Sequence, residues 1–202
     1  WMSHRSAEHA QNLERQATQL YLERPIDKPE QAEKNLKEAI ALYRQLLNQY
    51  HKTPTAHLAP FHLGNALAQA NDMTGAMDAY QQYIAAYPEN KMLLGLVLQR
   101  LAYARLVKGD VDGSVKSFTM ALESPDTLNK DQILYELGKL EESRSHPEGA
   151  LARYQELTKS YPNSPFAGEA AVRTKALETK AIPAAPAEPA LTPPAPVSGS
   201  GK

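Results

Sequence analysis

The sequence has 202 residues, of which 42% are hydrophobic and 22% charged, and its formal net charge is −1. A chain so close to neutrality lacks the basic surface that general nucleic-acid binding requires. It contains no cysteine, which excludes disulfide bonds, thiolate metal sites and cysteine nucleophiles. The longest apolar run, Met92 to Leu98, is far shorter than the roughly 20 residues of a membrane-spanning helix.

The first residues of the chain are Trp1 and Met2, and no basic start followed by an apolar stretch marks a secretory signal. Tryptophan is common where a membrane helix meets the aqueous interface. We therefore expect a trimmed or processed start, with an N-terminal membrane anchor in a segment upstream of Trp1. The alternative is a start at Met2 without an anchor.

Helical periodicity dominates the chain before its last twenty residues. Apolar residues recur at intervals of three and four, as in Leu36, Ile40, Tyr43 and Leu47. Alternating β-branched runs and Asn-Gly turns, the usual marks of strands, are nearly absent. Proline, glycine and Asn-Asp breakers divide the chain into segments that predict an all-α fold. The expected helices lie near residues 3–24, 29–51, 56–71, 73–87, 90–108, 112–124, 129–145, 147–161 and 164–180.

The last segment has a different composition. From Pro183 the chain reads PAAPAEPALTPPAPVSGSGK, with six prolines, which cannot form a helix or a packed core. We predict a disordered Pro/Ala-rich tail over residues 182–202, extended like polyproline and acting as a spacer. A ligand for a proline-binding domain at residues 193–196 is the alternative, and residues 198–202 are also compatible with a cloning linker.

A pattern of small and aromatic residues repeats along the helical part. Small residues spaced 37, 38 and 36 apart are each followed four positions later by an aromatic residue. The small residues are Ala39, Ala76, Ser114 and Ala150, and the aromatic residues are Tyr43, Tyr80, Phe118 and Tyr154. Twelve positions before the last three small residues lie Gly64, Ala102 and Gly138. Prolines follow twelve positions after two of them, at Pro88 and Pro162.

These positions predict pairs of packed helices. Small residues on both helices of a pair allow close approach, and we expect the aromatic residue to fill the gap between one pair and the next. The proline ends the second helix. One pair cannot bury its apolar face alone, so successive pairs must stack.

The pattern resembles the tetratricopeptide family over residues 37–162. The resemblance implies a solenoid of helical hairpins over residues 1–181, with repeats near 29–54, 56–89, 93–126 and 130–163 and a capping helix at 164–180. The departures are Pro60, Leu98 and Leu134 where the family has an early Trp, and Ser114 where it has Ala.

Two features of the sequence resemble those of bacterial envelope members of the family. The long repeat spacing and residues 161–167 resemble members such as the outer-membrane-assembly lipoprotein and the periplasmic cell-division coordinator. The opening residues 1–8 are similar to the stretch after the membrane helix in the ancillary Sec-translocon subunit family. This resemblance implies a membrane-tethered domain on the periplasmic side of the bacterial inner membrane, with a cytoplasmic domain as the alternative.

No set of residues carries the marks of catalysis or of cofactor binding. Among the six histidines, His57 and His62 are five positions apart and do not share a helix face. There is no His-Glu-x-x-His string, phosphate-binding glycine loop or Gly-x-Ser-x-Gly elbow. We therefore expect neither an enzyme nor a metal or cofactor site.

The resemblance also implies where a ligand binds, because first helices line the concave face of tetratricopeptide arrays. The expected peptide-binding groove comprises Phe61, Asn65, Gln69, Gln99, Tyr103, Tyr135, Lys139 and Glu142. The alternative places Phe61 and Tyr135 in the core. Asn65 fits the carboxylate-holding set of chaperone-binding members, but Gln132 and Glu136 stand where basic residues are needed, which disfavours acidic C-terminal tails as ligands.

The sequence thus predicts a non-enzymatic protein–protein interaction scaffold of the bacterial cell envelope that serves protein export or envelope assembly. The expected partner is another protein, through a peptide segment or a subunit, and not nucleic acid. Contact with a membrane is expected only through a segment upstream of Trp1. The alternative is a structural subunit or assembly factor of a larger membrane-associated complex.

Overall fold

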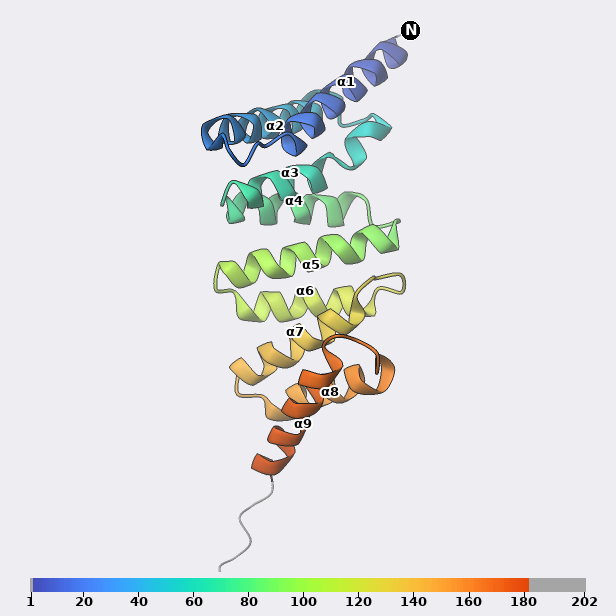
Figure 1. The fold of residues 1–202 in the computed structure, drawn as a ribbon. Helices are drawn as coiled ribbons and strands as arrows, with labels where there is room; N and C mark the ends of the chain where they lie inside the picture. Colours follow the sequence, from blue (N-terminus) through green and yellow to red (C-terminus); the bar gives the residue numbers. More distant parts are fainter. Residues whose placement is uncertain (1, 182–202) are drawn as a thin grey trace, which may run out of the picture.

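The computed structural model describes residues 2–181. The predicted tail over residues 182–202 and the expectation for Trp1 lie outside the described residues. Between them the chain forms nine α-helices and one short 3-10 helix, without strands (Figure 1). The elements are α1 Met2–Leu22, α2 Pro29–Tyr50, η1 Pro54–His57, α3 Ala59–Gln69, α4 Met73–Ala86, α5 Lys91–Val107, α6 Val111–Glu123, α7 Lys130–Ser143, α8 Pro147–Ser160 and α9 Ala167–Ala181.

The predicted all-α fold is confirmed, and two helix starts differ from the prediction. Where the sequence suggested one helix from residue 56, η1 occupies 54–57 and α3 begins at Ala59 with Pro60 in its first turn. Proline fixes φ and lacks an N–H, so it suits the start of a helix and breaks a longer one. At α9 the residues 164–166 form a turn in which Ser164 Oγ accepts a hydrogen bond from the Phe166 N–H at 3.1 Å.

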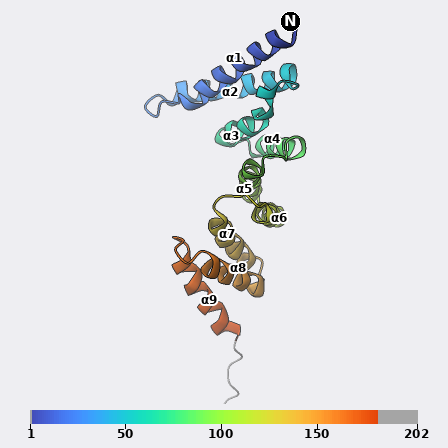
Figure 2. The ribbon, with the colours of Figure 1, turned by 90° about the vertical axis from the view of Figure 1, so that its right-hand side faces the viewer.

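The helices pair as antiparallel hairpins that stack along one axis. Figure 1 shows the turns within the hairpins α1/α2, α3/α4, α5/α6 and α7/α8 at one edge and the connections between hairpins at the other. Figure 2 shows α3 and α4 side by side, with the next hairpin below them. Residues 29–54, assigned from the sequence to the first repeat, contain α2 as their only α-helix, and its hairpin partner is α1. Helix α9 packs on α8 without a second helix of its own among the described residues.

The repeated glycine and aromatic residues meet inside single hairpins. A Cβ atom at Gly64 would overlap the Tyr80 ring, and one at Gly138 would overlap the Tyr154 ring. Both tyrosines are buried. Each tyrosine ring therefore lies on the glycine of its own first helix, while Tyr80 also belongs to a core cluster that includes Val97 and Leu101 of the next hairpin.

The turns within the later hairpins share one construction. A residue with positive φ, namely Asn71 at 62°, Gly109 at 80° or Ser145 at 59°, is followed by the N-cap residue of the second helix. In two of these turns the N-cap is an aspartate, Asp72 or Asp110, whose Oδ1 accepts a hydrogen bond from the third residue of the helix at 2.9 Å. Such caps satisfy backbone donors that the helix leaves unpaired.

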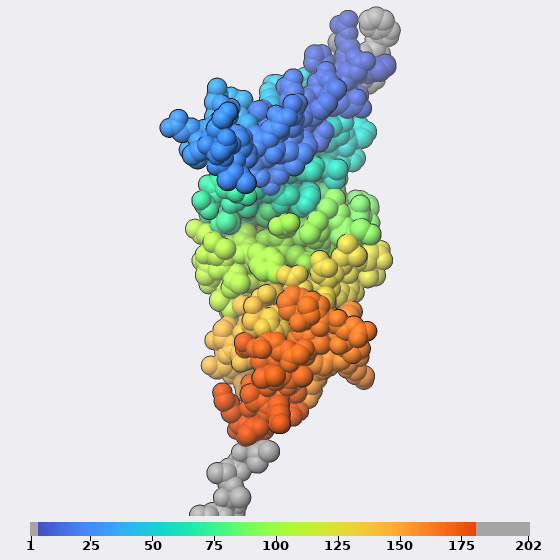
Figure 3. Space-filling model, in the orientation of Figure 1, coloured from blue at the N-terminus to red at the C-terminus, as the bar shows by residue number. Residues whose placement is uncertain are grey.

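The hydrophobic core runs through the whole stack as linked clusters. One lies between α1 and α5, one between α5 and α7, and one between α7 and α9. The molecule is elongated, and α1 projects from its upper end (Figure 3). None of the helices in residues 2–181 is long and apolar enough to span a membrane.

Candidate protein-interaction surface

The residues expected to bind a ligand lie on the first helices of three successive hairpins. We call the surface that they form the first-helix face. It comprises Phe61, Asn65 and Gln69 on α3, Gln99 and Tyr103 on α5, and Tyr135, Lys139 and Glu142 on α7.

On α3 the three residues differ in their surroundings. The half-buried Phe61 ring packs at the edge of the core, with its centre 6.4 Å from that of Tyr83. Asn65 Oδ1 accepts a hydrogen bond from the Tyr80 hydroxyl at 2.9 Å, which ties α3 to α4. Gln69 is exposed. Only Gln69 is therefore fully open to solvent on this helix of the predicted groove.

On α5 both residues link this helix to the next hairpin. The buried Gln99 donates a hydrogen bond from Nε2 to the Leu128 carbonyl at 3.3 Å. The Tyr103 hydroxyl accepts one from Gln132 Nε2 on α7 at 3.0 Å, while its ring meets the Phe118 ring edge-on at 5.1 Å. Partial burial raises the pKa of Tyr103 above its ordinary value.

On α7 the aromatic ring lies between Phe166, in the connection before α9, and a cation. The Tyr135 ring stacks on Phe166 with 5.1 Å between their centres. Lys139 Nζ lies 5.1 Å from the centre of the same ring and 2.9 Å from the Glu136 carboxylate. Glu136 therefore partly neutralises the charge of Lys139, which weakens the attraction of Lys139 for an acidic ligand.

Glu142 holds the last helix in place. Its Oε1 accepts hydrogen bonds from the Tyr154 hydroxyl at 2.6 Å and from Arg173 on α9 at 3.0 Å. Burial raises the pKa of Glu142, but these two hydrogen bonds, together with the charges of Arg173 and Lys180, outweigh burial and hold its pKa below the usual range. The carboxylate is therefore ionised at neutral pH, with its charge directed at Arg173.

The eight residues do not converge on one pocket. Contacts from α5 reach α7, and contacts from α7 reach α9, whereas Phe61 and Asn65 contact residues of their own hairpin. The first-helix face is therefore a surface spread over three hairpins, and its role in binding stays a prediction.

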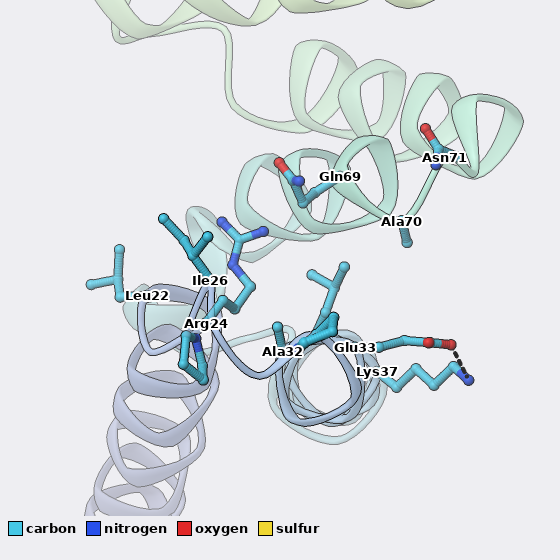
Figure 4. A pocket seen from close by; sticks show the side chains of 12 residues that line it. Leu22, Arg24, Ile26, Ala32, Glu33, Lys37, Gln69, Ala70 and Asn71 are labelled. Carbon is cyan, nitrogen blue, oxygen red and sulfur yellow. Dashed lines mark ion pairs between the residues drawn. The ribbon is translucent and has the colours of Figure 1, made fainter.

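A hollow of about 690 Å³ adjoins the face at Gln69. Figure 4 shows Gln69 from α3, Ile26 from the loop between α1 and α2, and Ala32 from α2 around it. An ion pair of 2.9 Å between Glu33 and Lys37 lies at its rim. No cluster of metal-ligating side chains occurs at this hollow or anywhere else in residues 2–181.

Sequence reasoning missed the partners that hold the face together, Gln132 and Arg173. Gln132 was considered only as a replacement for a basic residue, and Arg173 lies outside the repeated pattern, so neither contact was expected from the sequence. It also missed the exposure of Met92 and Leu96 on α5. A signal for these was present, because the apolar run from 92 to 98 is wider than one buried helix face requires.

Family models for the tetratricopeptide repeat match residues 28–91 and 132–164. Together with the stacked hairpins, these matches support a tetratricopeptide repeat protein. No curated protein matches the sequence significantly.

Solved tetratricopeptide-like structures share the fold. A tetratricopeptide repeat protein from Parabacteroides merdae matches 86% of this chain with a TM-score of 0.68 at 13% identity, and the match covers 61% of that protein. PilF from Pseudomonas aeruginosa matches 85% of this chain and 70% of its own with a TM-score of 0.56 at 16% identity. BtubC from P. vanneervenii matches 98% of both chains with a TM-score of 0.52 at 15% identity. At such identities the likeness shows the fold alone.

Proposed function

We propose that this protein is a non-enzymatic interaction scaffold that binds a polypeptide segment of another protein on its first-helix face. The observation that carries the proposal is a contrast between aromatic residues. Phe61, Tyr103 and Tyr135 on three successive first helices are half exposed, whereas the repeated aromatics of the second helices are buried. The tetratricopeptide fold is typically a scaffold of this kind.

The chemistry of the face suits a polypeptide ligand. Half-exposed tyrosine and phenylalanine rings offer large contact areas with few rotatable bonds, which is why aromatic residues contribute strongly to protein interfaces. Gln69 is exposed and free to bond a peptide backbone, and Lys139 is half exposed. Because three hairpins contribute, one segment lying along the stack can contact all of them.

The proposed place of action is the periplasmic side of the bacterial inner membrane, in protein export or envelope assembly. Its support is the resemblance of residues 1–8 and 161–167 to envelope members of the family. Fractionation of cells that express the native gene tests the location. Recovery in the cytosolic fraction would contradict the proposal, and so would an upstream coding sequence without an apolar span.

Site-specific crosslinking in cells tests the surface. A photoreactive residue at Tyr103 is expected to capture partner proteins, while the same probe at Lys116, an exposed residue on α6, is not. Capture at Lys116 alone would remove the first-helix face as the binding surface. The proteins captured also separate the two processes: translocon subunits indicate export, and subunits of one stable complex indicate a structural role.

A further inference from the structure

Helix α5 carries solvent-exposed apolar residues along its whole length. Met92, Leu96 and Val107 are 53%, 37% and 67% exposed, and Tyr103 between them is half-buried. Because successive residues of a helix are rotated by about 100°, these four residues fall within about 60° around the helix axis. We call them the α5 stripe.

No other helix in residues 2–181 carries more than one exposed large apolar residue. The others on helices are Leu22 on α1, Met120 on α6 and Val172 on α9, and those in connections are Ile26, Leu58 and Leu128. Ile26 and Leu22 are 100% and 71% exposed, but α1 ends between them, so they do not share a helix face. Exposed apolar side chains at helical spacing are therefore a property of α5 within the described chain.

Packing inside the chain covers the other side of α5. Val97 and Leu101 belong to the core cluster that extends back to α1, whereas Leu98 and Ala102 belong to the cluster shared with α6 and α7. By the same rotation per residue, these four buried residues lie on the far side of the helix axis from the α5 stripe. The stripe is therefore an apolar surface that the protein's own hairpins leave open, and such a surface indicates a protein contact.

The charged residues of α5 are all basic, namely Lys91, Arg100 and Arg105. Arg105 is already paired with Asp110 at 3.9 Å. The exposed Arg100, four positions after Leu96, borders the α5 stripe, and no carboxylate in residues 2–181 forms an ion pair with it. Arg100 therefore supplies an uncompensated positive charge beside the apolar surface.

Charges from the neighbouring elements do not reverse this sign. The charge of Glu136 on α7 acts on Tyr103, but Lys139 pairs with this carboxylate at 2.9 Å. Glu89 lies in the connection before α5, and Asp110 after α5 is the partner of Arg105. A partner that is complementary to the middle of the α5 stripe therefore carries a carboxylate.

The chemistry of the α5 stripe favours a helical partner over an extended one. Among its side chains only Tyr103 has a strong hydrogen-bonding group, and this hydroxyl already accepts a hydrogen bond from Gln132 at 3.0 Å. An extended segment would bury backbone donors and acceptors on the stripe without partners, which is costly, whereas a helix satisfies its own. From Met92 to Val107 the stripe is about 22 Å long, which about four turns of a partner helix cover.

We propose that the α5 stripe binds an acidic amphipathic helix of a partner protein that lies along α5. The apolar residues of this helix, at intervals of three and four, face the stripe, and a glutamate or aspartate beside them pairs with Arg100. The inference rests on the proposed interaction function and shares Tyr103 with the first-helix face, but it depends on Met92, Leu96 and Val107, which that face does not contain. Since α5 crosses the stack (Figure 1), a helix bound in this way lies across the stack and does not follow it over three hairpins.

Designed peptides provide the test. The probe is a fluorescein-labelled helical peptide of about 18 residues, with leucines at intervals of three and four, glutamates on both sides of the leucine face, and alanine or glutamine elsewhere. A shuffled peptide of the same composition has no apolar face, and a basic peptide has lysine in place of every glutamate. Fluorescence anisotropy with the full chain measures the dissociation constant of each. We expect the acidic peptide to bind at least about tenfold more tightly than the shuffled one and at least about threefold more tightly than the basic one.

Matched variants locate the site. Val107→Ser and Leu96→Ser are expected to weaken binding of the acidic peptide at least about fivefold, because each removes an apolar contact. Val172→Ser on α9 is the control and is expected to leave binding unchanged, since it alters the same residue type at nearly the same exposure, 65% against 67% for Val107. Arg100→Glu is expected to reverse the preference, so that the basic peptide binds more tightly than the acidic one. Circular dichroism during urea unfolding verifies that each variant is folded.

The outcomes separate this inference from the proposed function. Equal binding of the acidic and shuffled peptides, no binding of either, or equal losses in Val107→Ser and Val172→Ser overturns the α5 stripe as a helix site. An unchanged preference in Arg100→Glu overturns the acidic character of the partner. Photoreactive probes in cells distinguish the two surfaces. Capture of partners at Gln69 but not at Leu96 overturns the α5 stripe and leaves the first-helix face in place, whereas capture at Leu96 but not at Gln69 supports the stripe alone.

Discussion

The first and second helices of each hairpin use aromatic residues in opposite ways. On the second helices Tyr80, Phe118 and Tyr154 are buried, and the two tyrosine rings fill the space above a glycine of the paired helix. On the first helices Tyr103 and Tyr135 are half-buried. Each contacts an aromatic ring of its own hairpin and also a residue beyond it, Gln132 on α7 or Phe166 before α9. The comparison shows that the aromatics of the second helices are buried in the core, whereas those of the later first helices also connect neighbouring hairpins and remain partly open to a partner.

The largest effect is expected when a buried aromatic ring of a second helix is removed. Phe118→Ala leaves a cavity where a fully buried side chain of α6 packs against α5 and α7. We expect a loss of about 3–5 kcal/mol in the free energy of unfolding, measured by urea unfolding. Met120→Ala, two positions along the same helix and partly exposed, is the control and is expected to cost much less. Similar losses of stability for both variants would show that the Phe118 side chain contributes no more to stability than the exposed Met120 side chain.

Overpacking at the small residue of α8 is expected to have the next largest effect. Ala150 is fully buried beside Tyr154 and Leu134, so Ala150→Leu forces side chains apart and costs about 1–3 kcal/mol of stability. The control is Ala152→Leu on the exposed side of α8. An unmoved urea midpoint for Ala150→Leu contradicts close packing at this position.

A change on the first-helix face is expected to alter binding more than folding. With a partner captured by crosslinking, Tyr103→Ala is expected to weaken binding by about 1–2 kcal/mol, measured by isothermal titration calorimetry. Lys116→Ala on α6 is the control and is expected to be neutral. A Tyr103→Ala variant that binds normally but unfolds at much lower urea shows that Tyr103 only joins α5 to α7.

The smallest expected effect is a dependence of stability on pH at the junction of the first two hairpins. His62 of α3 stacks on Tyr43 of α2 at 5.6 Å. Burial lowers the pKa of His62, while the charge of Glu14 on α1 acts in the opposite direction. Since the unfolded chain takes up the proton first, the free energy of unfolding falls as pH drops below the ordinary histidine value near 6.5.

Replacing the ring isolates this contribution. His62→Gln is expected to flatten the pH dependence of the unfolding midpoint between about pH 7 and pH 5. His51→Gln, an exposed histidine, is expected to leave it unchanged. An identical pH dependence in the wild type and in His62→Gln assigns the effect to other groups.

The helices and their pairing could be predicted from the sequence, because both depend on local signals. Proline and glycine breakers and the three-and-four spacing marked the nine helices of the described chain, and the Gly64 and Tyr80 positions marked close packing. Spacing alone does not show which residues a ring contacts, so the contact of Tyr80 with Gly64 in its own hairpin was not expected from the sequence.

The candidate surface was less predictable, because exposure depends on neighbouring hairpins. The periodicity of α5 shows that Gln99 and Tyr103 lie one turn apart. It does not show that Leu128 and Gln132, 29 positions away from each, supply their hydrogen-bond partners. Likewise, Met92 and Leu128 are ordinary apolar residues in the sequence, and only the stacked structure places them around one hollow.

The turns have a consequence for how such a chain can evolve. Between the paired helices of the last three hairpins the connection is three residues long, at 70–72, 108–110 and 144–146. Between hairpins it varies, with residues 51–58, 87–90, 124–129 and 161–166. Insertions and deletions in descendants of this sequence should therefore accumulate at the variable edge, which is the edge that carries Met92 and Leu128. Partner choice can then diverge by loop length while the stacked hairpins are inherited unchanged.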